Sequence, residues 1–193
     1  MRRVALLLIS CAALTACVTP RPVPAPTPAP WAERVAQLQR ATAWQLDGRV
    51  AAAVGSQGWQ AGLNWRQRDA VTEVHLAGPL GVGATVLKKT ADGLSVNGAP
   101  PSGAELQQLQ QRLGFELPLD ELRFWLLGVP DPGAPFELTP GTGDRAQQVN
   151  QAGWTVTYDR YLPANGDLLP TRIVLTRDAV RVRIAVDHWE APR

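Results

Sequence analysis

Few side chains in this sequence could act as a nucleophile, a general base or a metal ligand. Histidine occurs at His75 and His188, and beyond the N-terminal segment serine occurs at Ser56, Ser95 and Ser102. These serines stand in apparent turn, strand-end or helix-cap contexts. The chain contains no Ser/His/Asp spacing, no HExxH motif, no Walker loop and no Cys/His cluster. The sequence therefore predicts no catalytic residue, no metal site and no enzyme activity.

One residue near the N-terminus has a pattern that predicts covalent chemistry. Two arginines precede the apolar run Val4–Leu14, which is shorter than the roughly 20 residues of a membrane span and is typical of a signal peptide. Leu14-Thr15-Ala16-Cys17 resembles the bacterial lipobox, in which the cysteine is lipidated and becomes the mature N-terminus. Cys11 lies in the segment that would be removed, so we expect no disulfide within the mature chain. Lipid on Cys17 is the only prosthetic group expected; an ordinary signal peptide cleaved near a cysteine is the alternative.

The remaining chain divides into a stalk and one domain. We expect residues 1–16 to be the signal peptide, 17–30 the lipidated cysteine with a Pro-rich stalk, and 31–193 a single domain. Proline occupies every second position from 20 to 30, which favours extended polyproline II at about 3.1 Å per residue and a semi-rigid stalk. A ligand for a Pro-recognising domain is the competing interpretation.

The charge balance argues against binding of nucleic acid. Without Arg2 and Arg3, the 19 basic residues fall to 17, which equals the 17 acidic residues. No basic stripe accompanies this balance, so we expect no nucleic-acid binding.

The hydrophobic spacing predicts a mainly β domain with about three helices. Helices are expected near 31–40, from a capping box at 102 to 113, and over 118–127. About ten or eleven strands with hairpin-like spacing complete the pattern, near 44–54, 59–65, 71–77, 83–89, 94–97, 135–138, 145–149, 154–159, 171–176 and 179–187. Because no βαβ alternation occurs, the predicted fold is α+β: an antiparallel sheet with helices on one face.

So many strands in one domain must curl, because wide twisted sheets rarely stay flat. A curled sheet covered by helices encloses a space, which is either a filled core or a ligand cavity. Several positions expected to face inward are small, including Ala51, Ala53, Ala61 and Gly62. The residue pattern alone leaves both possibilities open.

Taken together, the motifs resemble the LolB family of outer-membrane lipoprotein receptors. The resemblance covers essentially the whole mature chain, and the order of the motifs is more specific than any one of them. It is carried by the lipobox, the spacer, a Trp-led helix and the segments Asp47–Ala51, Pro79–Gly81, Leu122–Pro130, Gly153–Tyr158 and the last strand ending at Trp189.

That resemblance implies an open antiparallel half-barrel whose apolar cavity holds acyl chains. It implies a monomer that accepts lipoproteins from a periplasmic carrier of the LolA type and inserts them into the inner leaflet of the outer membrane without a nucleotide. Val18-Thr19 follow the cysteine, and by resemblance the absence of Asp there sorts the protein to the outer membrane, facing the periplasm.

The resemblance also assigns candidate site residues. Pro79, Leu80 and Gly81 would form a loop that contacts the membrane and promotes insertion, with folding of Leu80 back over its own sheet as the alternative. The cavity and its helical lid would be built from Trp44, Arg49, Trp59, Trp65, Trp125, Leu126, Leu127 and Trp154. Arg49 would help to close the cavity through a polar contact or form a surface ion pair, and ordinary core packing explains the lid residues equally well.

Two other classes of function remain open. One is an anchored periplasmic scaffold with a packed interior that binds a protein or cell-wall partner. The other is an envelope hydrolase using His188 or Asp120. It is disfavoured because His188 is typical of an edge strand, and Asp120-Glu121 begin a predicted helix, where the dipole favours negative charge.

Overall fold

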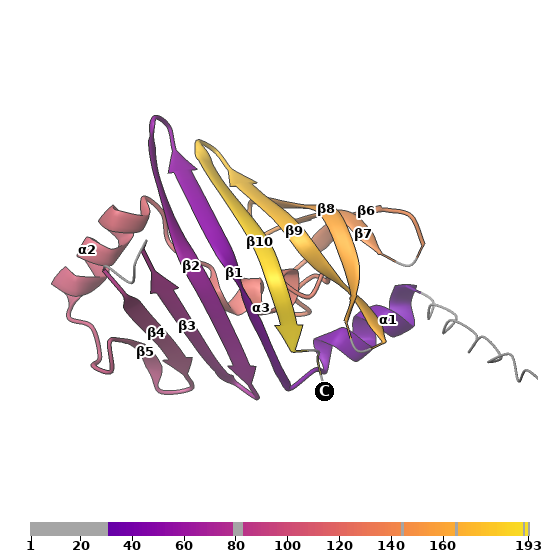
Figure 1. The fold of residues 1–193 in the computed structure, drawn as a ribbon, viewed down its shortest axis with the longest axis horizontal. Coiled ribbons are helices and arrows are strands. Elements are labelled where there is room, and N and C mark those ends of the chain that lie inside the picture. The colour runs from indigo at the N-terminus through magenta and orange to yellow at the C-terminus, as the bar shows by residue number, and fades with distance from the viewer. Residues whose placement is uncertain (1–30, 79–82, 144, 165, 191, 193) are drawn as a thin grey trace, which may run out of the picture.

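The strands of this protein form one open antiparallel sheet. The computed structural model describes residues 31–78, 83–143, 145–164, 166–190 and 192. Ten strands lie in the order β5-β4-β3-β2-β1-β10-β9-β8-β7-β6 (Figure 1), so the first and last halves of the chain meet where β1 pairs with β10. The strands are β1 Ala43–Val54, β2 Gln57–Arg68, β3 Val71–Ala77, β4 Thr85–Thr90, β5 Gly93–Val96, β6 Phe136–Pro140, β7 Ala146–Gln151, β8 Trp154–Ala164, β9 Asp167–Arg177 and β10 Val180–Glu190.

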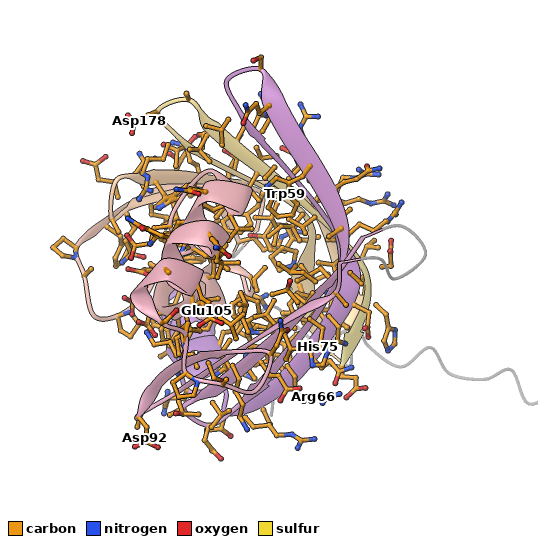
Figure 2. All side chains as sticks on the ribbon, turned by 90° about the vertical axis from the view of Figure 1, so that its left-hand side faces the viewer. Trp59, Arg66, His75, Asp92, Glu105 and Asp178 are labelled. Carbon is orange, nitrogen blue, oxygen red and sulfur yellow. The ribbon has the colours of Figure 1, made fainter. Side chains whose placement is uncertain are left out.

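Alternating side chains give the sheet two different faces. In β10, Val182, Ile184 and Val186 are buried, whereas Arg181 and Arg183 are exposed. This period of two is what a strand requires when one face meets the core and the other meets solvent. The sheet curls around the helices, as the view in Figure 2 shows.

The helices reach the inner face because of the order in which the chain visits the sheet edges. The strands β5 and β6 are consecutive in the sequence but occupy opposite edges of the sheet. The chain between them must therefore cross the sheet, and it carries α2, Gly103–Leu113, and α3, Leu119–Trp125. This crossing segment, residues 97–135, covers the face that the apolar side chains of the strands line.

Local signals in the sequence account for the helix ends. Ser102 Oγ accepts a hydrogen bond from the backbone N–H of Glu105, and the Glu105 carboxylate accepts one from the backbone N–H of Ser102. The predicted capping box is thus confirmed, and these hydrogen bonds lower the pKa of Glu105. Gly128 follows α3 with a φ of 81°, the left-handed conformation that favours glycine after a helix.

The N-terminal helix α1, Trp31–Gln39, lies at the end of the domain opposite to α2 (Figure 1). Arg34 donates hydrogen bonds to the Leu168 carbonyl and the Asp167 carboxylate at the start of β9. Gln39 Nε2 donates to the Pro130 carbonyl at 2.9 Å. None of the helices in the described residues is long and apolar enough to cross a membrane.

The predicted fold class is confirmed, and β8 and β9 are among the strands that differ most from their predicted ranges. Both strands are longer than predicted, because they continue through Pro163 and Pro170 to a turn near Gly166. Proline weakens a strand prediction since it cannot donate to the ladder. Here the two prolines pair with Leu168 and Tyr161, next to the irregular register of β8.

Candidate functional site

An apolar cavity lies between the inner face of the sheet and the crossing segment. Six strands line one side of it, and residues on both sides of the start of α3 line the other. All the lining side chains are aliphatic or aromatic: Val50, Trp59, Leu63, Trp65, Val74, Leu76, Phe115, Leu117, Pro118, Leu122, Leu126, Trp154, Leu175, Val182 and Ile184.

The cavity is small in this structure. Its volume is about 40 Å³, whereas a cavity of about 150 Å³ is needed to hold a benzene molecule. Close packing of Leu122 and Leu126, both buried, leaves the inner face nearly filled. A long acyl chain does not fit in this volume, so it could enter only if the crossing segment moved away from the sheet.

The structure brings some of the predicted cavity residues together and places others behind them. Trp59, Trp65, Trp154 and Leu126 line the cavity. The remaining apolar candidates are fully or nearly fully buried in the core without reaching it, namely Trp44, Trp125 and Leu127. Trp59 donates from Nε1 to the Leu113 carbonyl at 3.1 Å, which ties β2 to the end of α2 (Figure 2).

An aromatic cluster supports the cavity wall from the side of β1. The rings of Trp44 and Trp65 stack with centroids 6.0 Å apart and planes at 3°. Trp189 lies against Trp44 at 5.6 Å and donates from Nε1 to the Pro170 carbonyl. Such contacts fix the orientation of the indoles beyond what area burial alone does.

The end of α3 is held by a buried polar centre that the sequence analysis missed. Trp125 donates from Nε1 to Gln151 Oε1 at 2.8 Å, and its carbonyl accepts from the Tyr158 hydroxyl at 3.0 Å. Gln151 also accepts from the Asp131 N–H and donates to the carbonyls of Asp131 and Ala134. Nothing in the local pattern marks Gln151, because one glutamine in a strand gives no sign that loop backbone will close over it.

Arg49 lies on the outer face of the sheet, away from the cavity. It forms an ion pair with Asp187, with 2.9 Å between Nη2 and Oδ1 and a second hydrogen bond from Nε. The hydrogen bonds to Asp187 raise the pKa of Arg49. Of the two roles expected for Arg49, the surface ion pair is correct and closure of the cavity is wrong, since its side chain is 71% exposed.

Two predicted sites lie outside the described residues. These are the lipidation site, Cys17, and the loop Pro79, Leu80 and Gly81. Their roles stay predictions from the sequence.

The polar residues considered for catalysis make ordinary surface contacts. His75 Nε2 lies 2.6 Å from Glu73 Oε1, and this hydrogen bond lowers the pKa of Glu73. Asp120 pairs with Lys89 of β4, and His188 is exposed on β10. Within the part of the chain that the structure describes, no cluster of acidic, histidine or cysteine side chains could hold a metal ion.

The fold is shared with a solved structure. A crystal structure titled as a LolA superfamily protein from Nitrosomonas europaea superposes on 84% of this chain and 93% of its own with a TM-score of 0.52, at 9% identity. At that identity the likeness shows the fold alone, an open half-barrel covered by helices.

The particular family follows from the sequence comparisons. The model of the family described as outer membrane lipoprotein LolB matches residues 42–189. The outer-membrane lipoprotein LolB of Pseudomonas paraeruginosa is 33% identical over 164 residues, covering 83% of this chain and 80% of its own. That of Nitrosococcus oceani is 32% identical over 199 residues, covering 97% of both chains. This chain belongs to the LolB family.

Membership settles the broad role that the motifs implied. The protein is an outer-membrane lipoprotein that serves as a receptor in lipoprotein sorting, is anchored by lipid and faces the periplasm. It is not an enzyme. The hydrolase alternative is therefore wrong.

Proposed function

We propose that the apolar cavity receives the acyl chains of lipoproteins from a periplasmic carrier of the LolA type and releases them into the inner leaflet of the outer membrane. The observation that carries this proposal is the cavity itself, whose lining is apolar on both the sheet side and the helix side. A monomer anchored through Cys17 suffices, since each step needs only one cavity. Lipid on Cys17 is the sole prosthetic group in this scheme.

Shielding acyl chains from water is the physical task of such a receptor. Exposing a sixteen-carbon chain costs on the order of 10 kcal/mol, at about 0.8 kcal/mol per CH₂. Without a nucleotide, transfer is driven by differences in affinity between carrier, receptor and bilayer. Because the cavity holds about 40 Å³ when closed, loading must separate the crossing segment from the sheet.

The two ends of α3 differ in how firmly they are attached. The end at Trp125 is fixed by the buried hydrogen bonds to Gln151 and from Tyr158. The start has no side-chain cap and is tied to β4 by the ion pair between Lys89 and Asp120, of which Asp120 is 66% exposed. Exposed ion pairs contribute little. We infer that α3 swings away at its start while its end stays in place.

The loop at Leu80 supplies the release step in this proposal. An apolar side chain at a turn tip gains about 1.5–3 kcal/mol when it enters a bilayer, which is too little for anchoring beside a lipidated Cys17. We propose that the loop instead disturbs the lipid surface where cargo inserts.

The decisive experiment follows one labelled lipoprotein from its carrier, through this chain with Cys17→Ala, into liposomes. Leu80→Glu is compared with the parent and with Leu162→Glu, because Leu162 is an exposed leucine, 42% accessible, on β8. We expect the parent and Leu162→Glu to accept and deliver cargo, and Leu80→Glu to accept it and fail to deliver. Equal delivery by all three proteins would remove the loop from the mechanism.

A packed interior that binds no acyl chain is the alternative for the cavity, and its small volume is the observation that favours it. The same assay separates the two. If folded parent protein takes no cargo from a competent carrier and binds no fluorescent acyl probe, the interior is a plain core and the proposed use of the cavity is wrong.

A further inference from the structure

A polar groove adjoins the apolar cavity at the start of α3. Its volume is about 360 Å³, and it shares Leu117, Pro118 and Trp154 with the cavity as wall residues. The other walls carry charges of both signs, from Lys89, Glu116, Asp120, Glu121 and Arg177. One set of side chains therefore separates an apolar space from a polar one.

Trp154 stands in that partition with an unused hydrogen-bond donor. The residue is 2% exposed, and its Nε1 has no hydrogen-bond partner among the residues that the structure describes. By contrast, Trp59, Trp125 and Trp189 each donate from Nε1 to an oxygen of the protein. A buried donor without a partner is destabilising, and buried polar groups are normally paired.

The Trp154 ring has both an apolar and a charged neighbour. Phe115 meets it edge-on with centroids 5.8 Å apart, and Phe115 also lines the cavity. The guanidinium of Arg177 lies 4.4 Å from the ring centroid and lines the groove. The indole is thus held at the boundary between the acyl-chain space and charged solvent-facing side chains.

We propose that Trp154 Nε1 donates a hydrogen bond to the ester or amide carbonyl that joins an acyl chain to the polar part of the cargo, and that the adjoining groove receives that polar part. This inference rests on the proposed binding of acyl chains in the cavity. When the start of α3 moves away, the chain enters the cavity and its first polar atom, the carbonyl oxygen, reaches the partition. The mixture of charges in the groove suits a neutral linkage and a polypeptide better than a phosphate.

Trp65 provides an internal comparison. Its Nε1 is also buried without a partner, but Trp65 lines the apolar cavity and does not border the groove. A carbonyl held at the groove meets Trp154 and not Trp65.

The test uses two lipopeptides that differ only in the linkage. In one, a dye-labelled peptide carries sixteen-carbon chains on its cysteine through ester groups; in the other, CH₂ replaces each ester carbonyl, which gives uncharged ethers and leaves the net charge unchanged. Binding to the chain with Cys17→Ala is measured by fluorescence anisotropy for the parent, Trp154→Phe, Trp65→Phe and Trp59→Phe. Because Trp59 Nε1 already donates to Leu113, Trp59→Phe is the matched control.

We expect the parent to bind the carbonyl probe about 3- to 10-fold more tightly than the CH₂ probe, the contribution of one hydrogen bond. Trp154→Phe should bring this ratio close to 1, while Trp59→Phe and Trp65→Phe keep it. If Trp154→Phe unfolds, replacing its indole by benzothiophene removes only the N–H and gives the same comparison.

The outcomes separate this inference from the proposed function. A ratio near 1 in the parent, or a parental ratio in Trp154→Phe, overturns the role of Trp154 and leaves acyl binding in place. A folded parent that binds neither probe overturns both.

Discussion

The inner and outer faces of the same strands are built by opposite rules. On β10, Ile184 is 6% exposed and lines the cavity, whereas its neighbour Arg183 points outward to a shallow groove. Small side chains such as Ala51 and Ala185 line that groove together with arginines. The inner face is apolar and nearly filled, and the outer face is charged and open.

This difference shows where the sequence is constrained. In the proposed function, the inner face packs closely when empty and covers acyl chains when loaded, so shape and apolarity matter at every position. Side chains on the outer face need only be compatible with solvent, because water and salt screen the charge interactions between them. Replacements on one strand should therefore alternate between large and small effects.

The sharpest test of this comparison replaces neighbours on one strand. We expect Ile184→Ala to lower the free energy of unfolding by about 2–5 kcal/mol, because it removes buried methyl groups and leaves a cavity. Arg183→Ala should change it by less than about 0.5 kcal/mol, as is usual for exposed sites. Urea unfolding followed by circular dichroism measures both. Similar losses for the two variants would mean that the outer face is covered in the folded protein.

A second test concerns Gln151, a polar side chain that is buried in the core. Gln151→Leu should destabilise the fold by about 1–3 kcal/mol, because the Trp125 N–H and the Asp131 backbone groups lose their partner. Gln147 of the same strand is exposed, so Gln147→Leu is the control and should have little effect. Unfolding curves of both variants, collected in parallel, decide the point. An unchanged midpoint for Gln151→Leu would show that α3 is not held there.

How much the sequence could predict depends on how far apart in the chain the interacting residues lie. The alternation in β10, the capping box at Ser102 and the stop at Gly128 are local, and all three were predicted correctly.

The resemblance to the LolB family implied that Trp59, Trp65 and Trp154 line the cavity, and they do. The expectation that Ala51 and Ala53 face inward is wrong, because both are exposed and alternate with the buried Val50 and Ala52.

Contacts between distant segments could not be read in the same way. The partner of Arg49 depended on the strand pairing between β1 and β10 that brings Asp187 beside it. The importance of Gln151 depends on the backbone of residues 131–134, which arrives from the crossing segment. The closed volume of the cavity depends on how all the lining side chains pack at once, which no periodicity encodes.

A third test uses the titration of the two buried tyrosine side chains. Burial raises the pKa of Tyr158 and of Tyr161, so both phenols stay neutral in the folded protein. Their contribution to stability is fully present below the unfolded pKa of about 10. It is lost as pH rises further, because only the unfolded chain then releases the protons, by about 1.4 kcal/mol per pH unit for each tyrosine.

The chain contains two tyrosines in all, so tyrosinate absorbance reports on these groups alone. We expect it to appear together with the loss of circular dichroism above pH 10, and Tyr161→Phe to halve the slope of stability against pH. Absorbance that rises near pH 10 in a folded protein would contradict the burial of both phenols.

The smallest effect is expected at the ion pair between Arg49 and Asp187 on the outer face. Both side chains are more than half exposed, at 71% and 54%, so solvent and salt weaken their attraction. Arg49→Gln should leave the urea midpoint unchanged within the scatter of replicate curves, at low and at high salt. It should also leave acceptance of cargo from the carrier intact, because the side chain faces away from the cavity. A folded Arg49→Gln variant that no longer accepts cargo would show that the outer face also takes part in function. The contrast between a functional inner face and a solvent-exposed outer face without a function would then be wrong.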